Sequence, residues 1–357
     1  MQKLRFAMIG GGWRSEFYLR VAKALPELFE VTGVWMRDPK KSAVYAEKYG
    51  IRCCENVDAL IDTAPDFVVV SLSWEPAFIC NMQMVFRGIP TLTETPAAPN
   101  LDALNSLWEE VQKRNVRFLC GEAYHLQPFY CAAAWIAEKG IIGERQSLSL
   151  SMMHGYHAIN IARRLLGVGI GHAEFCGTRL KSQIIQTCDR NGAICDGRRI
   201  DSSRDLVLVK FENGKSFLYD FCDEQYFSLI RSRFLQLNGS HGELFMNRIR
   251  AFHNGSCTEE ALQRVDFYGE GNLVGIAHRG YTFRGEWIYE NPFPSAALTD
   301  DELSVASRLV EMGDYLKTGK SSYSLRDACQ DAYLSLLMTE AADSGKTVLT
   351  QSQAWFS

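Results

Sequence analysis

The chain of 357 residues lacks several features that would place it in a broad class of proteins. No apolar run approaches the length of about 20 residues that a membrane-spanning helix needs. The formal net charge of −4 leaves no basic field for nucleic acid, and neither internal repeats nor low-complexity segments are present. These absences predict a soluble globular protein that binds neither membranes nor nucleic acid.

The 11 cysteines lack the paired spacings of a metal or redox site, and no secretory apolar segment precedes them. We therefore expect reduced thiols and a cytoplasmic location. The neighbours Cys53 and Cys54 are compatible with a redox pair, but two buried thiols at the start of a strand are the simpler interpretation.

The most informative segment stands at the N-terminus, where a predicted strand over residues 3–9 leads into Gly10-Gly11-Gly12 and a predicted helix over 13–25. Strand, glycine turn and helix in this order are typical of a dinucleotide-binding site. Glycines at 10 and 12 allow a sharp turn and a close approach to a pyrophosphate, which the N–H groups of the helix start would bind. The third fingerprint position holds Ser15, which is small but not glycine. A glycine triplet can also be a plain turn, but its place directly after a strand favours a cofactor site.

Strands and helices alternate through the first third of the chain. Further strands are predicted over 29–36, 67–72, 90–93 and 116–120, and helices over 40–49, 77–87 and 101–114, the last capped by Asn100. These units predict an α/β fold, a doubly wound parallel Rossmann sheet. Its ligand crevice lies beyond the carboxyl ends of the strands, where Ser71, Leu72, Ser73 and Glu94 fall.

The second half of the chain has the pattern of an antiparallel sheet. Strands over 206–211 and 216–222 flank an Asn213-Gly214 turn, and strands over 227–238 and 242–246 extend the predicted meander. Two helices follow, one opened by a Thr299/Glu302 capping box and one capped by Ser324 and closed by Gly345. The stretch over 177–203 has no clear periodicity, and we expect a solvated excursion there rather than a flexible lobe near the site. We predict two domains, a dinucleotide-binding domain over 1–121 and an α+β domain over 122–357.

A series of short segments has an order and spacing typical of one protein family. They are Gly10-Gly11-Gly12, Arg37-Asp38-Pro39, Glu94-Thr95-Pro96, Gly140-Ile141-Ile142-Gly143, and His157-Ala158-Ile159-Asn160 followed by Leu165-Leu166-Gly167. In these segments the chain resembles the Gfo/Idh/MocA oxidoreductases. The resemblance implies an N-terminal Rossmann domain and a C-terminal domain built on an open, mainly antiparallel sheet. It also implies hydride transfer between a nicotinamide cofactor and a sugar, cyclitol or similar small hydroxy or carbonyl compound.

The chain departs from the family pattern at several site positions. Thr95 stands where the Glu-Lys-Pro motif of the family carries its lysine, and a hydroxyl can only hydrogen-bond as a neutral group. Met153 stands where many members have an aspartate, and a thioether cannot accept a proton. By the same comparison, Asn160 replaces a second aspartate and His125 replaces an arginine, so both are candidate substrate residues.

His157 is the titratable group that remains at the family's catalytic positions, and we predict it to be catalytic with help from Tyr156 or His154. An imidazole with an ordinary pKa of about 6.5 can relay a proton at neutral pH, as alcohol oxidation or carbonyl reduction requires. The alternative is a histidine hydrogen-bonded within a domain interface. No carboxylate lies near His154 and His157 in sequence to complete a metal site, so we predict no bound metal.

The end of the second predicted strand bears on the choice of cofactor. An acidic residue there would bind the adenosine ribose of NAD, but the chain has Met36-Arg37. A guanidinium binds a 2′-phosphate through paired hydrogen bonds, so we predict NADP in preference to NAD, although Asp38 could serve the ribose itself or begin a helix. The residues predicted to bind the cofactor are Gly10, Gly12, Trp13, Arg14, Arg37, Ser71, Leu72, Ser73, Glu94 and Thr95.

Two functional classes remain open from the sequence. The first is an NAD(P)-dependent oxidoreductase. The second is a non-catalytic relative that binds the cofactor as a sensor or regulator, and the absence of the family lysine at position 95 favours this second class. The predicted sheet carries apolar residues on both faces, with Phe217, Tyr219 and Phe221 on one and Leu218 and Cys222 on the other. We therefore predict a homodimer or homotetramer formed through the sheet.

Overall fold

A computed structural model describes residues 3–268 and 275–356 of the chain. These residues form two compact units that interleave along the sequence. The first contains 1–128, 265–280 and 290–330, and the second contains 129–264, 281–289 and 331–357. The predicted domain boundary at residue 121 stays a prediction, but the first unit takes in segments that lie far beyond it.

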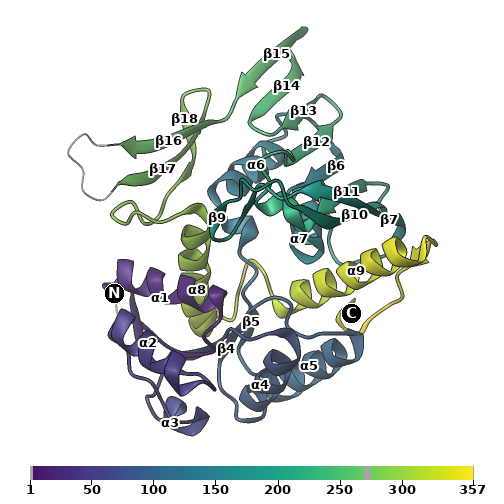
Figure 1. Cartoon of the computed structure of the whole chain (residues 1–357). Coiled ribbons are helices and arrows are strands. Elements are labelled where there is room, and N and C mark those ends of the chain that lie inside the picture. Colours follow the sequence, from purple (N-terminus) through teal and green to yellow (C-terminus); the bar gives the residue numbers. More distant parts are fainter. Residues whose placement is uncertain (1–2, 269–274, 357) are drawn as a thin grey trace. The chain divides into compact units, whose positions relative to one another are not determined.

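The first unit is built on a five-stranded parallel sheet (Figure 1). Its strands lie in the order β2 (Phe29–Trp35), β1 (Leu4–Ile9), β3 (Phe67–Val70), β4 (Thr91–Thr93) and β5 (Phe118–Cys120). The helices that connect or cover them are α1 (Trp13–Ala24), α2 (Pro39–Tyr49), α3 (Val57–Ile61), α4 (Trp74–Phe86), α5 (Leu101–Arg114) and α8 (Asp300–Thr318). The strand order reverses between β1 and β3, which makes their carboxyl ends the topological switch point of the sheet. This confirms the predicted doubly wound α/β fold.

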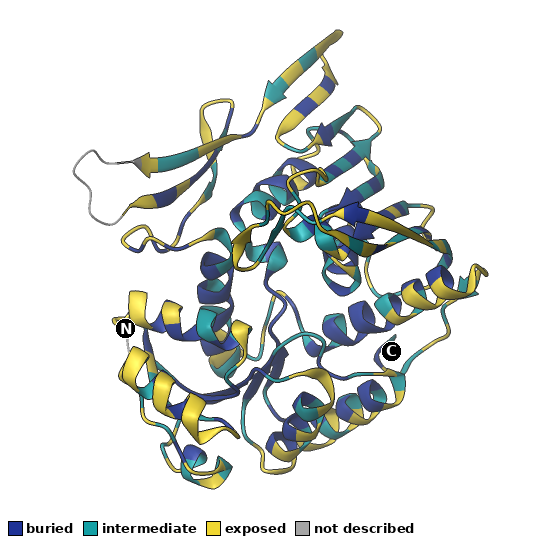
Figure 2. Cartoon of the chain, in the orientation of Figure 1, coloured by how far each residue is buried: buried dark blue, intermediate teal, exposed yellow. Residues whose placement is uncertain are grey.

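Alternate residues of β1 and β3 enter two different hydrophobic cores, which explains their continuous apolar sequences. Phe6, Met8, Phe67 and Val69 pack with α1 and α8, whereas Ala7, Ile9, Val68 and Val70 pack with α3 and α4. Strands β3, β4 and β5 of this sheet are buried along their whole length, and β1 over its second half, as the dark blue of Figure 2 shows. The predicted Asn100 cap is also confirmed, because its side chain accepts a hydrogen bond from the Ala103 amide. Gly50 ends α2 with a φ of 64°, in the left-handed conformation that glycine adopts readily.

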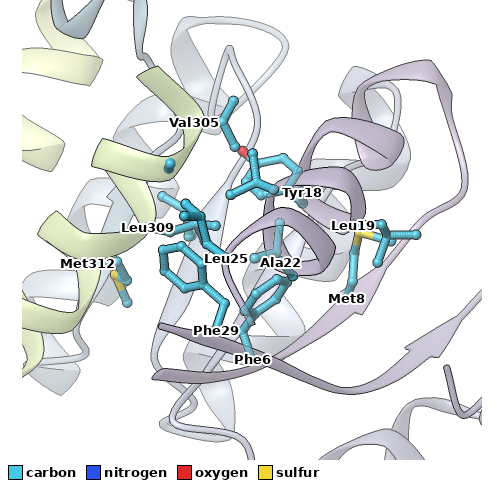
Figure 3. Close-up of a cluster of buried hydrophobic side chains, with 14 of the residues drawn as sticks. Phe6, Met8, Tyr18, Leu19, Ala22, Leu25, Phe29, Val305, Leu309 and Met312 are labelled. Carbon is cyan, nitrogen blue, oxygen red and sulfur yellow. The ribbon is translucent and has the colours of Figure 1, made fainter. Parts of the chain in front are cut away.

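Helix α8 belongs to the first unit although it lies near the C-terminal end of the chain. Its residues Val305, Leu309 and Met312 face the cluster of α1 and the sheet in Figure 3. Buried Arg308 donates from Nε and Nη2 to the carbonyl oxygen of Cys120, at 3.0 and 2.7 Å, and from Nη2 to that of Tyr323 at 2.8 Å. Helix α8 therefore packs on the sheet and α1 through apolar contacts and on the end of β5 through hydrogen bonds.

The second unit contains a nine-stranded sheet among the described residues. Its order is β15 (Ser256–Ala261), β14 (Arg248–His253), β13 (Gly242–Phe245), β12 (Phe234–Gly239), β6 (Arg145–Ser151), β11 (Ser216–Cys222), β10 (Arg199–Phe211), β7 (Ala173–Ile185) and β19 (Val348–Leu349). The pairing of β6 with β11 is parallel, and the other pairings that the structure describes in this sheet are antiparallel. This confirms the predicted open, mainly antiparallel sheet.

The remaining elements complete the chain. They are α6 (Pro128–Glu138), α7 (Gly155–Leu166), α9 (Leu325–Ser344), the short ribbon of β8 (Cys188–Asp189) and β9 (Gly192–Ala193), the sheet of β16 (Gln263–Tyr268), β17 (Ile276–Phe283) and β18 (Glu286–Glu290), and the 3-10 helices η1 (Tyr124–Leu126), η2 (Asp223–Tyr226) and η3 (Ala354–Phe356).

One prediction of local structure is wrong and another is incomplete. The strand predicted over 227–238 begins only at Phe234, because buried Gln225 in η2 donates to the Ser232 carbonyl oxygen at 2.8 Å and holds the preceding loop folded. The stretch over 177–203 is mostly exposed, as expected of a solvated excursion, but much of it is regular, since β7 and β10 pair from Ala173 and Phe211 to Ile185 and Arg199. Their outer part is mostly exposed on both faces, so it has no apolar alternation that periodicity could detect.

Candidate functional site

A cavity of about 1110 Å³ opens in the first unit at the carboxyl ends of β1, β2, β3 and β4. This is where ligands bind in doubly wound sheets, and the volume is slightly above the usual range of about 300–1,000 Å³ for small-molecule sites. All ten residues predicted to bind the cofactor line it, namely Gly10, Gly12, Trp13, Arg14, Arg37, Ser71, Leu72, Ser73, Glu94 and Thr95. The structure thus gathers the predicted set in one cavity, while its binding of a cofactor stays a prediction.

The three glycines of the turn, Gly10, Gly11 and Gly12, all line this cavity. Gly10 has a φ of 121°, and a Cβ there would lie 2.0 Å from the carbonyl oxygen of Ser71, so the turn has no room for a side chain. A Cβ on Gly12 would meet no atom within 4 Å, so the space above this residue is open. Helix α1 begins directly after this turn, and the N-terminus of a helix favours a bound anion. An open cradle beside a helix start fits a pyrophosphate.

Ser15 takes the place of the third fingerprint glycine through a hydrogen-bond network. Its buried hydroxyl lies 3.0 Å from that of Ser71 and accepts a hydrogen bond of 3.1 Å from the Gly12 amide. The side chain therefore ties α1 to the end of β3 at the position where the family fingerprint packs a glycine.

One end of the cavity, beside β2, carries positive charge. Arg37 and Lys41 are both exposed and both line it. Oδ1 of Asp38 accepts hydrogen bonds from the amides of Lys40 and Lys41 at 2.9 and 3.5 Å, so this carboxylate caps α2. Lys41 was not predicted from the sequence, although its place in the first turn of the Asp38-capped helix could have indicated it.

The other end of the cavity, beside β4, holds a charged cluster around Glu94. Oε1 of Glu94 accepts hydrogen bonds from the Tyr18 hydroxyl at 2.5 Å and from Nε of Arg14 at 3.3 Å, and Oε2 accepts one from the Thr95 amide at 3.4 Å. Nη1 of Arg14 also lies 3.0 Å from both carboxylate oxygens of Asp301. Asp301 is 287 residues from Arg14 in the sequence, so no local pattern could have found it.

The positive charge of Arg14 and the negative charges of Glu94 and Asp301 stabilise one another. Burial alone lowers the pKa of Arg14, but the carboxylates of Glu94 and Asp301 outweigh that effect and raise it above its ordinary value. Burial and the neighbouring Glu94 carboxylate also raise the pKa of Tyr18 well above its ordinary value. At neutral pH the cluster therefore contains a fixed guanidinium cation and a neutral phenol.

The predicted catalytic residues lie together at the start of α7, in the second unit. His154 is the N-cap of the helix, Tyr156 is buried in its first turn, and the rings of His154 and His157 lie 4.8 Å apart between centroids. The Tyr226 hydroxyl lies 2.7 Å from Nδ1 of His154 and accepts a hydrogen bond of 2.9 Å from its backbone amide. Tyr226 was missed because it is 72 residues away, in η2.

The two predicted substrate residues are placed differently. Asn160 is buried on α7, and its Nδ2 donates to Oδ2 of Asp331 at 3.0 Å, while Arg163 donates to Oδ1 of the same carboxylate at 2.5 Å. His125 lies in η1 of the first unit, with its ring 5.5 Å from that of Tyr323, and is not among the described residues that line the cavity. Their contact with substrate stays a prediction.

Over residues 3–268 and 275–356, no three His, Cys, Asp or Glu side chains are grouped closely enough to hold a metal ion. No disulfide is present among the described residues, which include all eleven cysteines, and burial raises the pKa of Cys80, which lines the cavity, to about 11. This thiol is therefore protonated at neutral pH and is a poor nucleophile. Within the described residues, no helix has the length and apolarity needed to span a membrane.

Comparison with known proteins agrees with the fold. Residues 4–122 match the model of the Gfo/Idh/MocA oxidoreductase family, which is described as an NAD-binding Rossmann fold. No curated protein matches the chain.

Several solved structures share the fold over nearly the full length of both chains. Levoglucosan dehydrogenase in complex with NADH and levoglucosan has a TM-score of 0.71 and 15% identity, covering 98% of this chain and 99% of that one. An oxidoreductase from Agrobacterium radiobacter in complex with NAD+, L-tartaric acid and magnesium has a TM-score of 0.69 and 18% identity, covering 97% and 98%. A myo-inositol dehydrogenase from Corynebacterium glutamicum has a TM-score of 0.65 and 14% identity, covering 98% and 100%. The predicted fold class and family resemblance are confirmed.

Proposed function

Because its residues 4–122 belong to the Gfo/Idh/MocA family of oxidoreductases, we propose that this protein is an NAD(P)-dependent dehydrogenase or reductase. The proposed substrate is a sugar, a cyclitol or a similar small hydroxy or carbonyl compound. The observation that carries this proposal is the cavity at the switch point of the sheet, with an open cradle over Gly12. A bound nicotinamide would supply the capacity to exchange a hydride. The residues of the chain would bind and orient the cofactor and the substrate, and would exchange a proton with the substrate oxygen.

We propose a preference for NADP over NAD. Arg37 and Lys41 offer two exposed cations at the β2 end of the cavity, which suit a 2′-phosphate. Asp38 could otherwise serve the ribose of NAD, but one of its oxygens already caps α2. The two relatives described above with a bound cofactor hold NAD+ or NADH, so the proposed preference rests on Arg37 and Lys41 of this chain and not on those relatives.

We propose that His157 accepts or donates the proton of the substrate oxygen. His154 lies against its ring, and the Tyr226 hydroxyl holds His154 at Nδ1 and at the backbone amide. An imidazole so placed on the first turn of a helix is oriented by its neighbours, and imidazole is the side chain most often used as a general acid or base. Tyr156 is buried beside it and would assist by fixing the ring.

The second candidate is a non-catalytic sensor that binds the same cofactor. Thr95, which lines the cavity, favours it because a threonine replaces the family lysine there. Hydride transfer depends mainly on positioning, however, so a changed motif is compatible with catalysis and the enzyme is preferred.

Two measurements test the proposal. Calorimetry with NADP+, NADPH, NAD+ and NADH should give tighter binding of the phosphorylated forms to the wild type, and Arg37→Ala should abolish that difference. Equal affinities in the wild type would contradict the NADP preference, and no binding at all would contradict the function. Turnover of NADPH with aldoses, ketoses, inosose or small keto acids supports the enzyme, whereas binding without turnover of any of them supports the sensor.

A further inference from the structure

Arg14 differs from the other cations of the cavity in how firmly it is held. Its Nε contacts Glu94 and its Nη1 contacts both oxygens of Asp301, while Arg37 and Lys41 are exposed. Glu94 is itself fixed by Tyr18 and by the Thr95 amide. Asp301 lies in the first turn of α8, where the helix dipole stabilises a negative charge. The guanidinium is thus oriented on two sides before any ligand arrives.

One nitrogen of this guanidinium is left for a ligand. Within the described part of the chain Nη2 of Arg14 makes no hydrogen bond, whereas Nε and Nη1 both do. The side chain lines the cavity and is 21% exposed. A guanidinium has five N–H donors, so a donor of this cavity-lining side chain remains available to a ligand.

The charges select the chemistry of that ligand. Arg14 carries one positive charge against two negative charges on Glu94 and Asp301, so the cluster repels a phosphate. A neutral diol suits it instead, because each hydroxyl can accept from the arginine and donate to a carboxylate oxygen. Both a ribose of the cofactor and a sugar substrate contain such a diol.

The order of the strands favours the ribose. Arg37 follows β2, the glycine turn follows β1, Ser71 follows β3 and Glu94 follows β4. Neighbouring strands lie about 4.8 Å apart, so the two ends of the cavity are about 14 Å apart. A dinucleotide with its 2′-phosphate at Arg37 and its pyrophosphate over the glycine turn must extend its second ribose toward β4.

We propose that Arg14 is a positioning residue that binds the nicotinamide-side ribose of the dinucleotide. Its fixed positive charge takes the place of the lysine charge of the family motif, which Thr95 does not provide. This inference rests on the proposed function, because it presumes that the cavity takes a nicotinamide dinucleotide.

Three ligands of increasing length test the proposal by calorimetry. They are 2′,5′-ADP, which ends at the adenosine half, 2′-phospho-ADP-ribose, which adds the second ribose, and NADPH. We expect Arg14→Gln to weaken the binding of the last two at least about tenfold, since a charge-assisted hydrogen bond is lost. The affinity for 2′,5′-ADP should not change.

Arg20→Gln is the matched control. Arg20 also lies on α1 and pairs with a residue of α8, Glu302 at 2.6 Å, but it does not line the cavity. Its substitution should leave all three affinities unchanged. Thr95→Lys in the Arg14→Gln background should restore part of the lost affinity for the two longer ligands, because an ammonium at position 95 replaces the lost charge.

The outcomes separate this inference from the proposed function. Wild-type protein that binds none of the three ligands, and neither NAD+ nor NADH, contradicts the function itself. Wild-type binding with equal effects of Arg14→Gln on all three, or with no effect on any, overturns the role of Arg14. An effect on sugar turnover alone would assign the diol to the substrate and also overturn it. If Arg14→Gln does not fold, Arg14→Lys is the alternative, because it keeps the positive charge but loses the planar, forked set of guanidinium N–H donors. It should weaken the binding of the same two ligands.

Discussion

The two fingerprint glycines have different reasons for lacking a side chain. Gly10→Ala places a Cβ 2.0 Å from a backbone oxygen at a φ of 121°, so we expect a loss of stability of at least about 2 kcal/mol. Gly12 has a φ of −75° and open space around its Cβ position, so Gly12→Ala should keep the melting temperature but weaken cofactor binding about tenfold. Thermal melts and calorimetry on both variants check this. Equal melting temperatures for the two variants would contradict the distinction.

Single residues were predictable where their chemistry is local. The glycine turn, Arg37, Ser71 and Glu94 each lie within a few positions of a recognisable strand end, and all of them line the cavity. Asp301 and Tyr226 lie 287 and 72 residues from the side chains that they contact. One sequence contains no signal for such pairings, because they depend on how distant elements pack.

Helices and strands with a recognisable cap or turn sequence were predicted correctly from the sequence. Strands without a periodic pattern of apolar residues were not predicted. Thr299 and Glu302 form the predicted capping box, and Asn213-Gly214 lies in the predicted hairpin. The outer part of β7 and β10 was missed. It is held by polar pairs such as Arg179 with Asp205, where Nε and Nη2 donate to the two carboxylate oxygens at 2.6 and 2.8 Å. A pair of strands held by polar side chains has no alternation of apolar residues, so this sequence pattern cannot detect it.

The attachment of α8 provides a test of element stability that depends on pH. Burial alone raises the pKa of Glu311, but the Arg308 guanidinium and the hydroxyl and amide of Ser322 hold it below its ordinary value. A carboxylate with a lowered folded pKa stabilises the native state above its unfolded pKa of about 4.3, and that contribution is lost as the pH falls further. Glu311→Gln should therefore lower the free energy of unfolding by about 1–3 kcal/mol at pH 7.

The same difference should shrink as the pH falls below about 4, because the wild-type carboxyl is then protonated as well. Denaturant unfolding at pH 7 and at lower pH measures it. Asp314→Asn, at an exposed position of the same helix, is the control and should change little at either pH. A destabilisation by Glu311→Gln that is independent of pH would show that packing, not charge, explains its effect.

At the scale of the whole molecule, the open face of the nine-stranded sheet bears on assembly. Phe217, Tyr219 and Phe221 are buried on one face of β11. On the other face Leu218 is 42% exposed and lies opposite Leu208, which is 37% exposed. Cys222, predicted to be on the open face, is buried where Gln225 of η2 accepts a hydrogen bond from its amide at 3.0 Å.

We predict that this face joins copies of the chain into a homodimer or homotetramer, because two adjacent exposed leucines in a regular sheet gain most from burial against an equally apolar surface. Leu218→Arg should convert the assembly to a monomer, since the charge could not be buried without a partner. Light scattering coupled to size exclusion at micromolar concentration measures the mass. Leu229→Arg is the control, because it places the same charge on an exposed leucine outside the sheet and should leave the mass unchanged. A monomeric wild type, or an unchanged mass for Leu218→Arg, would assign the leucines to the free surface of a single chain.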